Sequence, residues 1–267
     1  MERYRVRPGT TVDLASVDPA DRSGFDGDKH AAKEQLRHLR KRLAELQRVF
    51  WADGSHALLV VFQAMDTGGK DGTIRKVFAG VNPQGVDVTG FKKPSEEELS
   101  HDYLWRVHRH VPARGRIGVF NRSHYEDVLV VRVLGLVPEE RWRRRFDHIN
   151  AFERMLTDEG VRVVKFYLHI SREEQKRRLE ARLQDPTKLW KFNPADLDSR
   201  ARWDEYRVAY EEALARTSTD AAPWYVVPAD RKWYRNLVVA RTLIEHIEAL
   251  DPRYPTPAVD PERFVIT

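Results

Sequence analysis

The chain has 267 residues, of which 41% are hydrophobic and 33% charged, and its formal net charge is +5. A chain of this length can bury a sizeable core in one large α/β domain or two small ones. It has no cysteine, which excludes disulfides, zinc–thiolate sites and cysteine nucleophiles. The positive charge suits a polyanionic partner, but charge alone does not choose among nucleic acids, phosphorylated metabolites and inorganic polyanions.

Residues 1–28 contain Pro and Gly among scattered Asp, and we expect an extended arm. The opening MERYRVRPGT lacks the apolar core of a secretory signal, and no run approaches the eighteen or so apolar residues of a membrane span. We therefore expect a cytoplasmic protein with no membrane partner. A leucine stripe in residues 29–51 predicts an amphipathic helix that packs against the sheet or against a neighbouring subunit.

A short apolar run, residues 58–61, leads into the glycine-rich sequence AMDTGGKDGT at 64–73. Its β-branched residues favour a buried strand, and the apolar residues after Lys70 recur at helical spacing. Strand, glycine loop and helix form the context of a phosphate-binding loop, because backbone N–H groups converge there on an anion. Lys70 would add a positive charge for phosphate oxygens. The alternative is a glycine turn before an ordinary helix.

The loop departs from the usual G-x-x-x-x-G-K-[ST] pattern, with Ala64 in place of the first Gly and Asp71 in place of Ser or Thr. Asp66 adds a second carboxylate, which would repel phosphate unless a divalent cation lies between them. We interpret Asp66 and Asp71 as groups that organise a metal or activate a substrate. Alternatively, Asp71 only interacts favourably with the helix dipole.

Two more strands are expected at 86–91 and 116–120. Lys92 and Lys93 follow the first of them and either receive phosphate or lie in a solvated loop. Ser95 with Glu98 predicts a capping box for a helix that runs to about residue 108.

Asn121 ends the strand at 116–120, at a position where phosphate-loop proteins usually carry a metal-binding acid. Glu126 and Asp127 follow one helical turn later. Asn121 could hold a metal-bound water with Glu126 as a second carboxylate, or it could cap a helix at 123–132, and the two roles are compatible.

A helix at 139–158 and a strand at 161–170 continue a βα repeat, which predicts a parallel sheet. Residues 175–191 are rich in cations and broken by Asp185-Pro186. Arg178 and Arg182 share one helix face there, which is typical of a mobile lid that closes over phosphate, or of a salt-bridged surface helix. The last expected elements are a helix at 197–216, a strand at 224–227, a helix at 233–250 and an extended tail from 251.

Together these residues resemble the polyphosphate kinase 2 family. The matching stretches are AMDTGGKDGT (64–73), GFKKPSEEE (90–98), HDYLWRVH (101–108), GVFNRSHYEDVLVVRV (118–133), RRLEARLQDPTKLWKF (177–192) and APWYVVPADRKWYRN (222–236). The family also carries Asp at the positions of Asp66 and Asp71. The NRSHYEDV sequence, with Glu126, resembles the subgroup that phosphorylates both nucleoside mono- and diphosphates.

The resemblance implies a three-layer α/β/α fold of the P-loop kinase, thymidylate-kinase-like type, with a five-stranded parallel sheet and a helical lid. We expect one domain over residues 1–267. Its parts are an arm and helix (1–51), a core (52–170 and 220–250), a lid (about 171–219) and a tail (251–267).

The resemblance also implies a set of site residues. Catalytic roles fall to Asp66, Lys70, Arg122 and Glu126. Phosphate and polyphosphate would be bound by Thr67, Gly68, Gly69, Lys70, Asp71, Gly72, Thr73, Arg75, Lys92, Lys93, Arg178, Arg182 and Lys188. Nucleotide would be bound by Asn121, Arg122 and Ser123, and metal by Asp66, Asp71, Asn121 and Asp127.

The implied reaction is Mg²⁺-dependent phosphoryl transfer from inorganic polyphosphate to AMP and ADP, with Mn²⁺ as another usable metal. ATP and other purine nucleotides are further expected ligands. An ATP-dependent nucleoside monophosphate kinase is the alternative. We expect no nucleic acid partner, because the basic residues are interleaved with acids and no nucleic-acid motif is recognisable. The leucine stripe makes a homo-oligomer plausible.

Overall fold

A five-stranded, fully parallel sheet forms the centre of the computed structural model, which describes residues 1–259 and 263. The strands lie in the order β2-β3-β1-β4-β5. Their bounds are β1 Ala57–Gln63, β2 Val86–Gly90, β3 Ile117–Asn121, β4 Val161–His169 and β5 Trp224–Pro228. The five predicted strands and the parallel sheet are thus confirmed.

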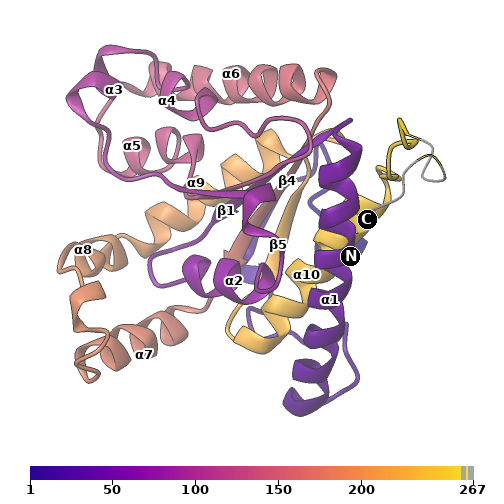
Figure 1. Ribbon diagram of the computed structural model, residues 1–267. Helices are drawn as coiled ribbons and strands as arrows, with labels where there is room; N and C mark the ends of the chain where they lie inside the picture. Colours follow the sequence, from indigo (N-terminus) through magenta and orange to yellow (C-terminus); the bar gives the residue numbers. More distant parts are fainter. Residues whose placement is uncertain (260–262, 264–267) are drawn as a thin grey trace.

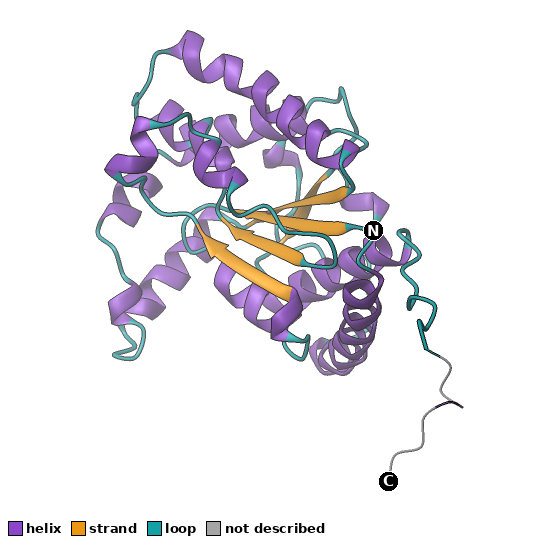
Figure 2. Ribbon diagram, turned by 45° about the horizontal axis from the view of Figure 1, so that its top comes forward, coloured by secondary structure: helices purple, strands orange, loops and turns teal. Residues whose placement is uncertain are grey.

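Helices cover both faces of the sheet, which gives three layers (Figure 1). One face carries α1, α2 and α10, and the other carries α5, α6 and α9 (Figure 2). The helices of these two layers are α1 Lys29–Asp53, α2 Lys70–Val77, α10 Lys232–Glu248, α5 Val130–Val133, α6 Glu139–Asp158 and α9 Trp203–Thr217. The shorter or peripheral helices are α3 Glu96–Ser100, α4 Trp105–His108, α7 Arg172–Leu183 and α8 Ala195–Ala201.

The central strands are buried along their whole length, because helices cover both sides of them. Every residue of β1 is buried, and β4 is buried except for the half-exposed Arg162. Near-continuous apolar runs are what a parallel sheet between two helical layers requires. The N-terminal arm joins this core: Arg5 forms an antiparallel bridge with Tyr225, and the Val6 amide donates to the Trp224 carbonyl at 2.9 Å.

Helix α1 packs along α10 on one face of the sheet (Figure 1). Its stripe is buried at Leu43, Leu46 and Phe50, and the helix ends at Gly54 in a left-handed conformation. The prediction leaves open whether this helix packs on its own chain or on a neighbouring subunit, and the structure shows that it packs within its own chain, chiefly against α10. Since the stripe is used internally, it gives no separate support to a homo-oligomer, which stays a prediction.

Three predicted helices are broken in the structure. The helix after Ser95 begins with the predicted capping box, but Asp102 then accepts the amides of Leu104 and Trp105 and starts a second short helix. The predicted helix at 197–216 divides into α8 and α9 at Arg202.

The predicted helix at 123–132 is also wrong. The chain forms a 3-10 turn, His124–Asp127, followed by the short α5. Ser123 caps that turn by accepting the Tyr125 amide, so the interpretation of Asn121 as the cap is corrected. The left-handed Arg122 separates Asn121 from the turn.

The predicted lid region, 171–219, divides into two parts. Helices α7 and α8 project away from the sheet, whereas α9 packs against α5 and α6 and buries Tyr206, Tyr210 and Leu214. Among the described residues, no helix is both long and apolar enough to cross a membrane. Of the predicted tail, 260–262 and 264–267 lie outside the described residues.

Candidate active site

The candidate site lies where β1 and β3 end side by side. Phe62, near the end of β1, pairs with Asn121, the last residue of β3. Strand β2 lies on one side of this pair and β4 on the other, so the chain connections diverge here. Ligands of open α/β sheets bind at such a switch point. Two non-glycine residues, Thr67 (φ 60°) and Arg122 (φ 65°), have left-handed backbones just after the two strands, and strained backbone of this kind is common at functional sites.

The glycines of the loop allow close approaches that a side chain would prevent. A Cβ atom on Gly68 would lie 2.4 Å from the Cβ of Ala64, and one on Gly69 would lie 2.2 Å from Nη1 of Arg235. Gly69 also has a φ of 99°. Helix α2 begins directly after it, and no side chain caps this end. The first N–H groups of α2 are therefore available to an anion.

Lys70 is held inside the loop, where its Nζ donates to the Ala64 carbonyl at 3.2 Å. Burial, together with the nearby Arg122 charge, lowers the pKa of Lys70 to about 8. Tyr210 of α9 donates to the same Ala64 carbonyl at 3.1 Å. A cation that is enclosed and only partly compensated in this way is well suited to bind a phosphate oxygen.

Arg122 connects the two strand ends. Its Nη2 donates to Oδ1 of Asp66 at 2.9 Å, and its Nη1 lies 3.6 Å from Oε2 of Glu126. The Glu126 charge is the largest cause that raises the pKa of Arg122, and Asp66 adds to it against burial. The predicted catalytic residues Asp66, Lys70, Arg122 and Glu126 are thus neighbours, although they come from two separate loops.

Asp71 links three elements at the mouth of the loop. The amide of Asn121 donates to its Oδ1 at 2.6 Å, and Nζ of Lys191 lies 3.8 Å from its Oδ2. Lys191 belongs to the segment between α7 and α8, so the projecting part of the chain reaches the first turn of α2. Asp71 itself remains largely exposed.

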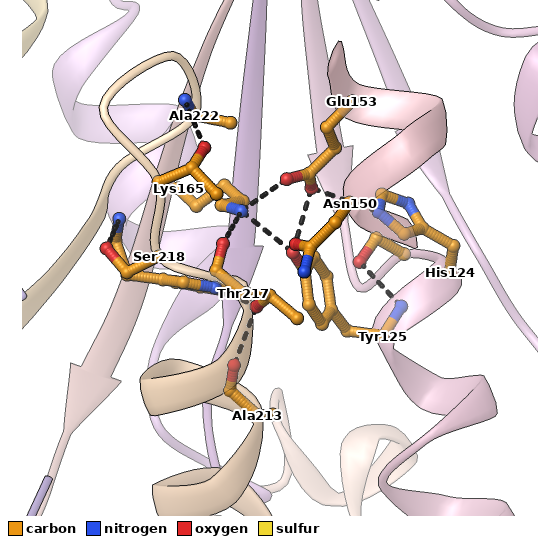
Figure 3. Close-up of polar contacts among 12 residues, drawn as sticks. His124, Tyr125, Asn150, Glu153, Lys165, Ala213, Thr217, Ser218 and Ala222 are labelled. Atoms are coloured by element: carbon orange, nitrogen blue, oxygen red, sulfur yellow. Dashed lines mark hydrogen bonds and ion pairs between the residues drawn. The ribbon is translucent and has the colours of Figure 1, made fainter. Parts of the chain in front are cut away.

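A buried polar network supports the segment that carries Arg122 and Glu126 (Figure 3). Lys165 of β4 forms an ion pair with Glu153 of α6, and it also donates to the Tyr125 hydroxyl at 2.8 Å and the Thr217 carbonyl at 2.7 Å. Tyr125 donates to Glu153 at 2.8 Å. Burial is the largest influence on Glu153 and would raise its pKa, but the charges and hydrogen bonds of Lys165 and His124 together outweigh it, so the pKa is lowered.

The residues of the segment 122–126 therefore have two different roles. His124 and Tyr125 are fully buried and contact Glu153. On either side of them, Arg122 pairs with Asp66 of the loop and Glu126 pairs with Arg122. The network thereby fixes the backbone from which the two charged site residues project.

Arg178 is predicted to lie on a mobile lid, but in the structure it packs against the phosphate-binding loop. It is buried, and its guanidinium donates to the carbonyls of Thr67 at 3.1 Å, Gly68 at 3.0 Å and Ala229 at 2.6 Å. It also pairs with Glu174 at 2.6 Å. This arginine therefore braces the loop from behind, which the pattern of cations in residues 175–191 could not show.

The other predicted lid cations pair within their own segment. Arg182 lies 3.2 Å from Asp196 of α8, and Lys188 pairs with Asp185. The predicted phosphate ligands Arg75, Lys92 and Lys93 are exposed. In the part of the chain that the structure describes, these last three side chains make no hydrogen bond or ion pair to the loop.

Two further predicted ligands point away from the loop. The Ser123 hydroxyl is buried and accepts from the amides of Tyr125 and Gln63. Asp127 accepts from Arg145 at 3.0 Å; burial raises its pKa, and the Arg145 charge opposes that rise. Of the predicted metal ligands, only Asp66, Asp71 and Asn121 adjoin the loop. No group of three or more His, Cys, Asp or Glu is placed to hold a metal among the described residues.

Sequence reasoning missed three residues that contact the loop: Arg235, Tyr210 and Gln175, whose side-chain amide donates to the Asp66 carbonyl at 3.0 Å. A signal existed for Arg235, since it is the one charged residue in the mostly apolar stretch 233–240 of α10. No local pattern marks the other two.

Comparison with known proteins agrees with this geometry. The model of the polyphosphate kinase 2 (PPK2) family matches residues 26–255. The chain is 54% identical, over the whole length of both, to "AMP/ADP-polyphosphate phosphotransferase" of Meiothermus ruber. It is 46% identical to "ADP-polyphosphate phosphotransferase" of Rhodopseudomonas palustris, covering 96% of this chain and 93% of that one.

A solved structure shows the same fold. The crystal structure of polyphosphate kinase 2 from Arthrobacter aurescens TC1 superposes with a TM-score of 0.95 and 45% identity, covering 98% of this chain and 93% of that chain. Family model, relatives and structure all agree, and the chain belongs to the polyphosphate kinase 2 family.

Proposed function

We propose that this protein transfers a phosphoryl group from inorganic polyphosphate to AMP and to ADP. The observation that carries the proposal is the loop itself: an uncapped helix start, the enclosed Lys70, and the Asp66–Arg122 pair that joins the ends of β1 and β3. Phosphoryl transfer needs little covalent help from a protein. Positioning of the two phosphates and cations around the transferred group supply most of the catalysis.

Each of the central residues has a defined task in this proposal. Loop amides and Lys70 hold the terminal phosphate of the donor. Asp66, itself oriented by Arg122, orients the acceptor phosphate, and the Arg122 guanidinium offsets negative charge between donor and acceptor. The terminal P–O–P bond of polyphosphate breaks as a phosphate oxygen of the acceptor forms the new P–O bond. That oxygen is already ionised at neutral pH, so no side chain need remove a proton.

Use of both acceptors is supported by the relative from M. ruber, whose name includes AMP and ADP. Glu126 is the residue we assign to the shorter acceptor, because its carboxylate lies beside Arg122 at the edge of the pair with Asp66. Replacement of Glu126 by Ala should therefore impair the AMP reaction more than the ADP reaction. Equal losses for both acceptors, measured as kcat/KM, would remove this role.

Mg²⁺ is the proposed metal, with Mn²⁺ as an alternative. Mg²⁺ is usually held by one or two carboxylates, substrate phosphates and water, so it does not need a cage of protein ligands. Asp66 and Asp71 both adjoin the loop and fit this limited requirement. They would hold the ion, which would offset charge on the phosphates. Asp127 does not fit, because it points away from the loop and toward the buried Arg145.

The segment between α7 and α8 is the proposed lid. Lys191 already approaches Asp71, and Arg182 lies on the same projecting part of the chain. We propose that these cations close over the phosphate chain when it binds. A homo-oligomer is also proposed, and the mass of the protein in solution would test it.

The test of the function mixes purified protein, Mg²⁺ and long-chain polyphosphate with AMP or with ADP, without ATP, and separates the nucleotides by chromatography. ADP and then ATP should form from AMP. ATP formed only from ADP would keep the donor and remove the dual acceptor. A folded protein that makes ADP from AMP only when ATP is supplied would instead be a nucleoside monophosphate kinase.

A further inference from the structure

Arg235 is a buried cation that has no carboxylate partner among the described residues. It lies in the first turn of α10, with only 2% of its surface exposed. Its Nε and Nη2 donate to the side-chain oxygen of Asn236 at 3.2 and 3.0 Å, and its Nη1 lies 3.5 Å from the Gly68 carbonyl. Among the described residues, no Asp or Glu lies within ion-pair distance of it.

The guanidinium lies directly against the phosphate-binding loop. Its Nη1 approaches Gly69 closely, as described above. Its Nη2 lies near Gly72 in the first turn of α2, where an added Cβ atom would be 3.8 Å from it. Arg178 is the other arginine behind the loop, and its Nη1 would be 3.4 Å from a Cβ on Gly69. Two guanidinium groups, one from α7 and one from α10, therefore pack behind the loop at Gly68 and Gly69.

The charges behind the loop do not cancel. Among the described residues, Glu174 is the only carboxylate within ion-pair distance of Arg178, it also pairs with Arg177, and Asp230 adds one further negative charge nearby. Burial and the Arg178 charge lower the pKa of Arg235 to about 9. Burial, with Arg178 and Arg235 next in importance, also lowers the pKa of Lys232. Removing a cation from water without a partner is strongly unfavourable, so such an arrangement needs a reason.

We propose that Arg235 is a positioning residue for the phosphate chain, placed behind the loop so that the bound phosphate supplies its missing negative charge. It contacts the loop backbone, and it acts on the ligand through the charge and position of residues 68–72. The proposal rests on the proposed function, because it assumes that the loop binds phosphate. A purely structural arginine is the alternative.

The two alternatives predict opposite effects on stability. A structural arginine stabilises the free protein, so its loss lowers the melting temperature whether or not ligand is present. A buried cation whose counter-charge comes only from the ligand destabilises the free protein. Its replacement by an apolar side chain of similar length therefore leaves the free protein equally or more stable. The increase in melting temperature that ligand produces is then reduced, because that increase reports affinity for the folded state.

The experiment measures thermal unfolding of the full chain with and without tripolyphosphate or ATP at constant ionic strength, and dissociation constants by calorimetry. The variants are Arg235→Met and Arg235→Lys. Arg241→Met is the matched control, because Arg241 lies on the same helix and also hydrogen-bonds only to neutral oxygens, those of Gly24 and Gln35.

Arg235→Met should weaken tripolyphosphate binding about tenfold or more and reduce the ligand-induced rise in melting temperature. Arg235→Lys should restore most of the affinity because it keeps the charge, and Arg241→Met should bind as the wild type does. A wild-type dissociation constant in Arg235→Met, at any melting temperature, would overturn the proposal.

Failure of the proposed function has a different signature. If the wild type binds ATP but not tripolyphosphate, polyphosphate as donor is wrong, and the role of Arg235 is decided by the ATP affinities of the same variants. If the wild type binds neither ligand, the loop holds no phosphate and the role of Arg235 is overturned with it.

Discussion

Lys165 and Arg235 are the two most deeply buried cations among the described residues, and their surroundings differ. Lys165 lies in the core with Glu153, the Tyr125 hydroxyl and the Thr217 carbonyl arranged around it (Figure 3). Arg235 is about as deeply buried, but within the described part of the chain its hydrogen bonds go only to the Asn236 amide oxygen and the Gly68 carbonyl. In the first region the counter-charge belongs to the chain, and in the second region it is left to a ligand.

The two regions therefore serve different purposes: the Glu153–Lys165 pair stabilises the core, and the cations near the loop bind ligand. The Glu153–Lys165 pair is complete without any ligand, so it can hold the segment from Arg122 to Glu126 in place at all times. On the loop side, neither Lys70 nor Arg235 forms an ion pair with a carboxylate of the described residues, and burial lowers both pKa values. At Lys70, the charges of Asp66, Glu126 and Asp71 partly oppose this lowering of the pKa. Binding of a polyanion is most favourable where the protein has left cations uncompensated.

Removal of Lys165 should give the largest effect. In Lys165→Met the Glu153 carboxylate remains buried without its partner, and the free energy of unfolding should fall by about 3–5 kcal/mol. Urea denaturation measures this, with Lys41→Met as an exposed control. Adding Glu153→Leu to Lys165→Met should recover part of the loss, and a double variant less stable than the single one would contradict a complete internal pair.

Removal of Lys70 tests the opposite side of the comparison. Lys70→Ala should lower kcat/KM about 10²–10³-fold, since a cation aimed at developing charge is lost. The free protein should be no less stable, because burial disfavours this charge. Lys76→Ala, an exposed lysine on the same helix, should retain wild-type activity. Near-wild-type turnover in Lys70→Ala would show that the site is misplaced.

Two glycines with the same backbone geometry distinguish strain from contact. Gly69 and Gly80 both have a φ of 99°, but a Cβ on Gly80 meets nothing within 4 Å. Gly80→Ala should lower the free energy of unfolding by about 1–2 kcal/mol, because alanine is strained in a left-handed backbone conformation. Gly69→Ala must also displace Arg235 and should weaken polyphosphate binding as well. Equal effects of the two changes on binding would argue against contact between loop and arginine.

The pH profile gives the smallest effect. Lys70 in the free protein loses its charge as the pH rises through about 8. The value of kcat/KM for polyphosphate, which reports the free enzyme, should therefore fall above pH 8, approaching about tenfold per pH unit. Stability should change in the opposite direction. Because the unfolded lysine binds its proton more tightly than the folded one, the free energy of unfolding should increase as the pH rises from about 8 to 10.5. A flat kcat/KM profile to pH 10 would contradict the role of Lys70.

Much of the fold could be predicted because its signals are local. Strands β1 and β4 are continuous apolar runs, and the glycine-rich loop between β1 and α2 has a recognisable spacing. Two of the helices that were predicted too long are interrupted by a side chain that hydrogen-bonds to the backbone. Asp102 and Ser123 each accept a backbone amide hydrogen and begin a new turn of helix. Such competition between side chain and helix depends on one residue and has no periodicity.

The site was only partly predictable, for a related reason. Asp66, Lys70, Arg122 and Glu126 occur in motifs, and the structure brings them together. The inward position of Arg178 and the contact of Arg235 with the loop arise from packing between α7, α10 and the loop, which are far apart in sequence. A buried arginine and a solvated one look alike in a sequence.

The salt dependence of binding tests the central comparison most directly. Log Kd for polyphosphate should be measured against log salt concentration in the wild type, Arg235→Met and Lys165→Met, at a temperature where all three are folded. Each cation that a polyanion neutralises adds to the slope, so Arg235→Met should reduce it by about one, and Lys165→Met should leave it unchanged. Equal slopes in the wild type and Arg235→Met, or a reduced slope in Lys165→Met, would contradict the account.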